Sequence, residues 1–364
     1  MRRPSSNAPA VHTIVPPHVF DQLATLSPSR WPGLAERAQV NMQAAAAVRF
    51  ERAAFLATAA VPTNGARSVH DAEHDSRLPG RTVRREGEPA SGDVAVDEAY
   101  DGLGATREYY RQVHARDSID GDGQALVATV HYLHDFDNAF WNGRQMVFGD
   151  GDGEIFTRFT RPLEVIGHEL AHGVTQAEAA LVYEGQSGAL NEHMSDVFGV
   201  LVKQFALGQT AREADWLVGA GLWAPGVNGT ALRSMAAPGT AYDDPRIGRD
   251  PQPAHMRDYV DTMRDNGGVH INSGIPNHAF WIASQTFDGF AWQHAGPAWY
   301  EALTNMLSPM ADFRDAARAT VDAAAAQAGL DAARVVRAAW EAVGVRTTAR
   351  RRTRRVAEPE RRQA

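Results

Sequence analysis

Two histidines and a glutamate stand close together in the segment LEVIGHELAHGVTQ, where His168, Glu169 and His172 form the pattern H-E-x-x-H. If this segment is helical, residues four apart lie about 40° apart around the axis, so both imidazoles face one point. A zinc ion requires that arrangement. Glu169 lies about 100° round the helix from His168. Its carboxylate can reach a water on the metal without being a ligand, which predicts a general base.

The other faces of this segment are apolar, which predicts a buried helix. The apolar positions are Val165, Ile166, Leu170, Ala171 and Val174. A five-residue pattern is not specific by itself, and two core histidines bonded to backbone carbonyls are the alternative interpretation. A third ligand farther along the chain would favour the metal site.

A second apolar segment, SGALNEHMSDVFGVLV, supplies the candidate. Glu192 and Asp196 lie four apart on a helix that should be buried, where an acid usually binds a metal or is paired. Catalytic zinc takes three protein ligands and a water, so we assign Glu192 as the third ligand. We expect Asp196 and Asn191 to accept the second ring N–H of the two ligand histidines. His193, the rival candidate for the third ligand, points to a different face of this helix.

A second histidine–carboxylate pair occurs in DNGGVHINSG, where Asp265 precedes His270 by five residues across a Gly-Gly turn. A helix is predicted to begin near Asn272. A carboxylate beside an imidazole keeps it protonated or oriented. Such pairs also occur as structural hydrogen bonds, so this pair alone does not decide its role.

The elements that must position these residues follow from hydrophobic periodicity. Short strands and hairpins are predicted over 67–105, and the runs ALVATVHYL and RQMVFGDGDGEIF predict paired strands around Asn142-Gly143. Helical spacing occurs over 40–61, 102–114, 163–178, 188–206, 272–286, 294–308, 311–327 and 331–343. We therefore predict an α+β protein with strands in the front half, helices in the back half, and the chemistry at the join.

Composition limits the classes of function. The 364 residues are 44% hydrophobic, with net charge −8, so a large core is possible and nucleic acid is not an expected partner. There is no cysteine, so a metal must be held by nitrogen or oxygen. No segment is predicted to be a signal peptide or a membrane span. The arginine-rich residues 346–364 predict a disordered tail, with docking to nucleic acid, to an anionic surface or to a partner as the alternatives.

Several motifs in order resemble the thermolysin family of zinc metalloendopeptidases, the gluzincins. They are DNAFWNGRQMVFGDGDG at 137–153, HELAHGVT, Tyr183, SGALNEHMSD, LRSM at 232–235 and DNGGVHINSG. The resemblance covers about residues 67–343. It implies a two-lobed fold, with a β-rich N-terminal lobe, an all-α C-terminal lobe and zinc between them. The implied activity is neutral endopeptidase cleavage before a hydrophobic residue.

The resemblance also implies a role for each matching position. The zinc ligands are His168, His172 and Glu192, with Glu169 as base, Tyr183 and His270 as donors to the oxyanion, and Asp265 orienting His270. The implied substrate-backbone contacts are Asn138, Ala139, Trp141 and Arg233. The implied apolar pocket after the scissile bond is formed by Phe156, Phe159, Val165 and Leu232.

The segment IVPPHVF, from Ile14 to Phe20, is similar to the compact propeptide of the protealysin subgroup. That similarity implies a zymogen whose own propeptide inhibits it, with processing between about residues 55 and 68. His18 stands where the subgroup has an aromatic residue. The expected organisation is a propeptide at 1–65, an α+β lobe at 66–187, a helical lobe at 188–345 and the tail at 346–364.

Calcium is expected to bind weakly or not at all. Of the acidic positions that hold paired calcium ions in thermolysin, Glu164 and Asp215 remain, while Lys203, Leu217 and Ala220 occupy others. A lysine ammonium there could replace the ion. The family implies secretion, with a cytoplasmic location as the alternative, a monomer, and protein or peptide substrates.

Two other functions fit parts of the pattern. A degenerate protease could bind zinc without cutting, although Glu169, His270 and Arg233 argue against it. An aminopeptidase would need an extra carboxylate to capture a free amine, and no motif marks one.

Overall fold

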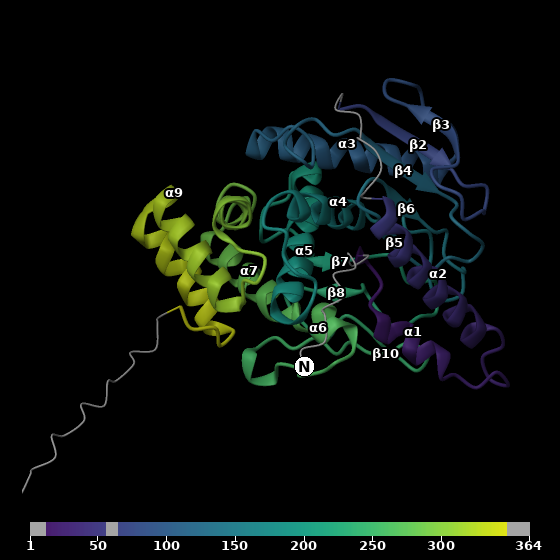
Figure 1. The fold of residues 1–364 in the computed structure, drawn as a ribbon. Coiled ribbons are helices and arrows are strands. Elements are labelled where there is room, and N and C mark those ends of the chain that lie inside the picture. Colours follow the sequence, from purple (N-terminus) through teal and green to yellow (C-terminus); the bar gives the residue numbers. More distant parts are fainter. Residues whose placement is uncertain (1–11, 56–64, 348–364) are drawn as a thin grey trace, which may run out of the picture.

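A β-rich lobe and a helical lobe meet at two packed helices, α4 (Leu163–Ala177) and α5 (Gly185–Leu207), in the computed structural model (Figure 1). The structure describes residues 12–55 and 65–347. Strands dominate the front of the chain and helices the back, which confirms the predicted α+β class. The H-E-x-x-H residues lie on α4 and Glu192 lies on α5, so the chemistry does lie at the join.

One mixed sheet forms the framework of the β-rich lobe. Its strands, in the spatial order β1-β5-β6-β4-β2-β3, are β1 (His12–Thr13), β5 (Ala139–Trp141), β6 (Met146–Phe148), β4 (Leu126–Val130), β2 (Arg67–Asp71) and β3 (Arg81–Arg85). The side chains of β5 and β6 are buried along their whole length. Since β1 is the first strand of the chain, its pairing with β5 brings the N-terminal segment onto the edge nearest α4.

The predicted pairing around Asn142-Gly143 is partly wrong. The Asn-Gly turn joins β5 to β6, with Trp141 opposite Met146 in an antiparallel hairpin. The run at 125–133 contributes β4, which pairs with β6 in parallel. This direction is possible because the chain passes from β4 through 131–138 into β5, which runs antiparallel to β6. Residues 139–141 carry no polar–apolar alternation because every side chain is buried, so periodicity gave no strand there.

Helix α3 (Val94–His114) covers the sheet and begins earlier than the predicted start at residue 102. Its N-terminus is capped by Asp93, whose carboxylate accepts the backbone N–H groups of Ala95 and Val96. This cap satisfies two donors that would otherwise face solvent. The residues before 102 were predicted as strands and hairpins, so the first two turns of this helix were missed.

The helical lobe contains most of the remaining regular structure. Its members are α6 (Asp265–Asn272), α7 (Gly274–Phe287), α8 (Ala295–Glu301), η2 (Ala302–Met306) and α9 (Phe313–Ala342). The helices predicted at 311–327 and 331–343 both lie within α9 and are separated by a non-helical kink at Gly329, where φ is +83°. The helix predicted over 272–286 corresponds to α7, whose first residue lies close to the expected start. Short pieces between the lobes are β7 (Leu217–Val218), β8 (Arg233–Ser234), β9 (Asp243–Asp244), β10 (Gly248–Arg249) and η1 (Met256–Asp258).

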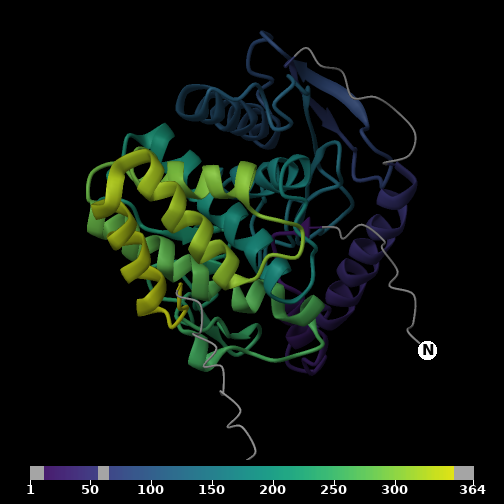
Figure 2. The same ribbon diagram turned by 60° about the vertical axis from the view of Figure 1, so that its left-hand side comes forward.

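The N-terminal residues form two helices, α1 (Pro17–Ala24) and α2 (Leu34–Phe55). Helix α2 begins before the predicted start at residue 40, and its predicted continuation to 61 lies outside the described residues. In both views α2 runs along the outside of the molecule, next to the β-rich lobe (Figure 2). Arg37 forms an ion pair with Glu154 at 2.5 Å, and the Asn41 side chain accepts the Asp137 N–H at 2.8 Å. The N-terminal segment is therefore docked by polar contacts as well as by β1.

Helices α4 and α5 approach closely because glycines face each other between them. A Cβ on Gly199 would lie 2.5 Å from the backbone oxygen of Glu164 and 3.0 Å from the backbone nitrogen of His168. Any side chain at position 199 would push α5 away from α4. Glycine there allows the two helices to present their ligands to a common point.

Two further predictions concern the ends of the chain and membranes. The 346–364 tail, apart from its first two residues, lies outside the described residues. Within 12–55 and 65–347, no helix has the length and apolar character to cross a bilayer.

Candidate metal centre

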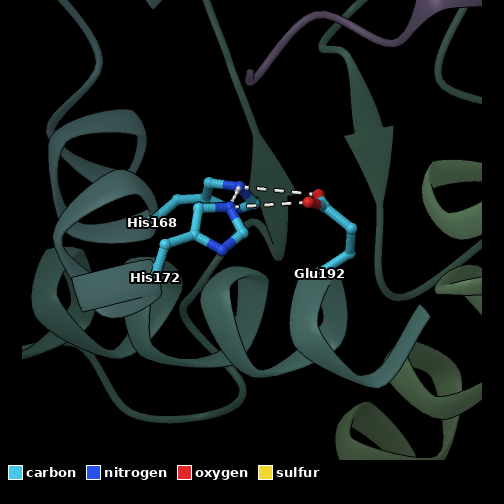
Figure 3. A group of neighbouring side chains, drawn as sticks. All are labelled: His168, His172 and Glu192. Carbon is cyan, nitrogen blue, oxygen red and sulfur yellow. Dashed lines mark hydrogen bonds and ion pairs between the residues drawn. The ribbon is translucent and has the colours of Figure 1, made fainter. Parts of the chain in front are cut away.

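Three donor side chains converge where α4 meets α5 (Figure 3). The Nε2 atoms of His168 and His172 are 3.1 Å apart. The Glu192 carboxylate lies 3.6 Å from the first of these nitrogens and 3.4 Å from the second. A tetrahedral zinc ion at about 2.0–2.1 Å from each donor would hold the donors about 3.3 Å apart. The observed separations match that requirement.

The hydrogen bonds behind the two imidazoles fix their tautomers. The Nδ1 of His168 lies 2.8 Å from Asp196 Oδ1, and the Nδ1 of His172 lies 2.8 Å from Asn191 Oδ1. Both oxygens accept, so each Nδ1 carries the proton and each Nε2 presents a lone pair. The Asn191 orientation is fixed by its own donation to the Leu181 carbonyl at 3.1 Å. Two lone pairs aimed at one point repel unless a cation lies between them.

Glu192 supports the same conclusion. Its carboxylate is fully buried, and its Oε2 accepts no hydrogen bond from the described residues. A buried carboxylate oxygen without a donor is costly unless a cation compensates it. The donor set therefore fits a zinc ion, with nitrogen and oxygen ligands and an orphaned oxygen on the third.

Glu169 is buried beside this donor set without belonging to it. Its Oε2 accepts the Trp141 backbone N–H at 2.9 Å, which ties α4 to β5. That bond places the base candidate against β5, the strand that pairs with β1. The role of Glu169 as a base next to the metal, outside its ligand set, stays a prediction.

Tyr183 and His270 form a second cluster on the opposite side of Glu192. The Tyr183 hydroxyl donates to Glu192 and lies 3.2 Å from His270 Nε2. Asp265 accepts from His270 twice, at 2.6 Å from Nδ1 and 2.8 Å from the backbone nitrogen. Burial disfavours the charged form of His270, but the nearby Asp265 and Glu192 outweigh it and raise its pKa to about 9.

The turn that presents His270 adopts an unusual backbone. Asp265, Asn266, Gly267 and Gly268 all have positive φ, from +49° to +84°. Gly267 and Gly268 take this conformation without steric cost, whereas Asp265 and Asn266 take it at a steric cost. Consecutive left-handed residues fold the Asp265 carboxylate back onto the N-terminal end of the helical turn that carries His270. The Gly-Gly pair was the sequence signal for this turn.

Arg233 and Asp196 form a buried pair behind the metal ligands. Arg233 donates from Nε and Nη2 to the two oxygens of Asp196, at 2.9 and 2.8 Å. Burial alone would raise the pKa of Asp196, but Arg233 and His168 reverse the effect and hold it well below its usual range. Asp196 is therefore charged, and one carboxylate serves both a metal ligand and Arg233.

The N-terminal strand occupies the groove between these groups. Ile14 donates to the Ala139 carbonyl at 3.2 Å, and Val15 donates to Asn138 Oδ1 at 3.1 Å. The Ile14 carbonyl accepts from Arg233 Nη1 at 3.1 Å. The Thr13 carbonyl lies 3.0 Å from His270 Nε2. The predicted substrate contacts Asn138, Ala139 and Arg233 thus all bind one extended peptide, which runs antiparallel to β5 past Trp141.

The apolar positions named for the pocket are also brought together. Phe156, Phe159, Val165 and Leu232 are buried, and the first two rings lie 5.5 Å apart. Ile14 and Val15 are fully buried in the same hydrophobic cluster. The substrate pocket that these four residues were expected to form stays a prediction.

The acidic residues Glu164 and Asp215, which were expected to have lost their calcium ions, face an ammonium group. Lys203 Nζ lies 2.9 Å from Asp215, 3.5 Å from Glu164 and 3.3 Å from the Leu217 carbonyl. Burial raises the pKa of Glu164, and Lys203 opposes that change. The Ala220 backbone N–H donates to the other Glu164 oxygen at 3.1 Å, so the oxygens that remain are already satisfied.

Sequence reasoning missed several polar residues around the centre. Ser195 lies 3.0 Å from His172 Nδ1, and its spacing from Asn191 was the available signal. Gln252 donates to the His270 carbonyl at 2.7 Å, and Asn277 donates to Asp196 at 2.8 Å. Neither belongs to a local pattern, because packing of distant segments brings them here. His193 faces Asn277, away from the metal ligands, as its position on the helix predicted.

A buried His-His-Glu donor set with an adjacent glutamate, in a groove that binds an extended peptide, defines a zinc metallopeptidase. Residues 62–176 match the thermolysin metallopeptidase catalytic domain, and residues 179–345 match its alpha-helical domain. The chain belongs to the thermolysin family.

Individual relatives agree with this assignment. An extracellular metalloprotease of Pectobacterium carotovorum subsp. carotovorum is 55% identical over 280 residues, which is 77% of this chain and 81% of that protein. A thermolysin of Alicyclobacillus acidocaldarius subsp. acidocaldarius is 43% identical over 265 residues, covering 70% of this chain and 46% of that protein. The solved structure of the precursor of protealysin from Serratia proteamaculans superposes with a TM-score of 0.84 at 49% identity, covering 92% of this chain and 99% of that one. The protein is a zinc-dependent neutral metalloendopeptidase with a thermolysin-like two-lobed fold.

Proposed function

We propose that His168, His172 and Glu192 hold the catalytic zinc and that Glu169 is the general base of peptide-bond hydrolysis. The observation that carries this assignment is the convergence of two Nε2 lone pairs and an orphaned carboxylate oxygen at one point. Asp196 and Asn191 hold the ligand histidines in the required tautomer.

Zinc bound here would polarise the scissile carbonyl and lower the pKa of a water to about 7. Glu169 takes a proton from the attacking water and delivers it to the leaving amine. Tyr183 and His270 donate to the carbonyl oxygen as it gains negative charge, and Asp265 keeps His270 oriented for that bond. Removal of one such donor typically costs about 10²–10³ in turnover.

The N-terminal strand indicates how a substrate binds. The carbonyl next to His270 belongs to Thr13, and the next residue, Ile14, bonds Arg233 through its own carbonyl. In a substrate these positions correspond to the residues before and after the scissile bond. The residue after the cut would then lie with Phe156 and Phe159, which supports the expected preference for a hydrophobic side chain there.

Residues 1–65 are proposed to be an inhibitory propeptide, because β1 fills the substrate groove and α2 docks outside it. The resemblance to a structure described as a protealysin precursor supports a zymogen. Most of the expected processing region, 55–68, lies outside the described residues. The mature enzyme would comprise lobes at 66–187 and 188–345, although α5 begins at Gly185, just before that division.

Secretion is the proposed location, because relatives from Pectobacterium and Serratia are named extracellular metalloproteases. The enzyme is proposed to act as a monomer on protein or peptide substrates. Lys203 is proposed to replace the paired calcium ions of thermolysin, since its ammonium group bonds Asp215 and faces Glu164.

Substitution of Glu169 by alanine tests the mechanism. The full-length Glu169→Ala chain should retain zinc by metal analysis and lose nearly all hydrolysis of an unfolded protein, whereas His168→Ala should lose both. Glu341→Ala, at an exposed position on α9, is the matched control. Mass spectrometry of products, with and without chelator, distinguishes internal cuts from end trimming. Retained hydrolysis by Glu169→Ala would contradict the mechanism, and a zinc-bound native chain that cuts nothing would indicate a degenerate binding protein.

A further inference from the structure

His193 follows the ligand Glu192 on α5 but is absent from the chemistry described above. Its ring is fully buried on a different face of the helix, toward α7 and α8. A buried imidazole is costly unless both nitrogens are satisfied. Both are satisfied, and the partners form a directed chain of hydrogen bonds.

The direction of that chain follows from its outer end. Trp299 Nε1 can only donate, and it lies 2.8 Å from His193 Nε2, so this nitrogen accepts. The His193 proton is therefore on Nδ1, which donates to Asn277 Oδ1 at 2.8 Å. With its oxygen committed to His193, Asn277 must turn its amide nitrogen toward Asp196 Oδ2, at 2.8 Å. Asp196 in turn accepts from His168 at 2.8 Å.

Asp196 is the residue that connects this chain of hydrogen bonds to His168 and Arg233. Its Oδ1 accepts from His168 and from Arg233 Nη2, each at 2.8 Å. Its Oδ2 accepts from Arg233 Nε at 2.9 Å and from Asn277 at 2.8 Å. Four donors fill the four lone-pair directions of the carboxylate. If Asn277 were removed, one direction would be vacant and the carboxylate could rotate toward Arg233.

The outer end of the chain is held rigidly. Trp299 stacks nearly parallel on Trp340, with ring centroids 6.1 Å apart and 8° between planes. Phe280, on α7, packs edge-on against Trp299 at 5.0 Å. Trp340 donates to Thr320 at 2.9 Å, within α9. The helical lobe thus presents Trp299 from a packed aromatic layer.

We propose that Asn277 and His193 are positioning residues for the metal centre. They transmit the packing of the helical lobe to Asp196, and so fix the angle at which His168 meets the zinc and Arg233 meets the peptide. This inference rests on the proposed roles of His168 and Asp196. It assigns a purpose to a histidine that sequence reasoning had considered only as a rival ligand.

Asn277→Leu is the direct test, because leucine has a similar size and no donor. Loss of a group that orients a metal ligand typically lowers metal affinity by about 10- to 100-fold. Zinc dissociation constants are measured by chelator competition in full-length chains that all carry Glu169→Ala, so that none can cut itself. Visible spectra of the cobalt-substituted chains report the ligand geometry. We expect weaker zinc binding and a shifted cobalt spectrum.

Thr320→Val is the matched control, because it removes a buried hydrogen bond from the same aromatic layer without touching the path to Asp196. It should lower the melting temperature while zinc affinity and the cobalt spectrum stay unchanged. His193→Leu should weaken zinc binding, whereas His193→Asn, which keeps a donor near the Nδ1 position, should restore most of it. In the otherwise native chain, Asn277→Leu should raise KM as well as lower kcat, because Arg233 is displaced too.

Zinc affinity and cobalt spectra of Asn277→Leu that match those of Thr320→Val would overturn the proposal. So would equal zinc affinities for His193→Leu and His193→Asn. Failure of the proposed function has a different signature, since the parent chain with only Glu169→Ala would then bind no zinc.

Discussion

We expect His18 to make docking of the N-terminal segment sensitive to acid. It lies on α1, where its Nε2 bonds the Tyr242 hydroxyl at 2.7 Å and its buried Nδ1 has no hydrogen-bond partner among the described residues. Burial lowers its pKa from the ordinary 6.5 to about 4, an effect that Asp265 opposes and that His270 and Arg233 reinforce. A protonated His18 would carry an unsolvated N–H next to two other cations.

The direction of the pH effect follows from proton counting. The docked segment has the lower pKa and therefore binds fewer protons than the undocked segment, so acid favours undocking. Docking is at full strength above pH 6.5 and weakens as the pH falls from about 6.5 toward 4. As the pH falls from 7.5 to 5.5, His18 of the undocked segment gains most of a proton, while His18 of the docked segment stays neutral. The docking constant should fall about tenfold, or about 1.4 kcal/mol.

The assay uses the full-length Glu169→Ala chain, which cannot process itself, and a fluorescent peptide with the sequence of residues 12–16. This probe binds the groove only when β1 has left it. Its apparent affinity should rise about tenfold from pH 7.5 to 5.5, relative to the same titration of a His18→Phe chain. Phenylalanine keeps an aromatic ring without a titrating group, so the control contains every other pH effect. Parallel pH profiles for the two chains would refute the reasoning.

Three substitutions test other contacts. Lys203→Met should lower the free energy of unfolding in urea by about 3 kcal/mol, because Glu164 would lose its cation; a change below about 1 kcal/mol would contradict the role of the ammonium group. Gly199→Ala should lower it by about 1–3 kcal/mol through the clash with the Glu164 carbonyl, and an unaltered melting temperature would be inconsistent with that packing. Tyr183→Phe should lower kcat about 10²- to 10³-fold with zinc content retained, whereas normal kcat would remove Tyr183 from the reaction.

Local helix geometry explains why most of the centre could be predicted. The pairs His168–His172 and Glu192–Asp196 are each four residues apart, so α-helical spacing alone puts their members on one face. Burial of both helices then followed from their apolar neighbours. The contact of Arg233 with the bound peptide was harder to predict. Arg233 is an isolated arginine in the sequence, and only the resemblance to a family singled it out.

Contacts between distant segments were not accessible in the same way. Val15 bonds Asn138 across 123 positions, and Asn277 reaches Asp196 across 81. Nothing in the residues near Asn277 marks it as different from any other helical asparagine. Strand β5 was missed for a local reason. Complete burial of its side chains removes the polar–apolar alternation on which strand prediction depends.

The sharing of Asp196 has a thermodynamic consequence. His168 and Arg233 bond the same oxygen, so the metal and the peptide are not independent ligands of this protein. Whatever coupling free energy the metal adds to peptide binding through this carboxylate, the peptide must return to metal binding in equal amount. Measured zinc affinity therefore depends on whether the groove is filled. The chain with β1 in place and the chain without β1 should have different zinc dissociation constants.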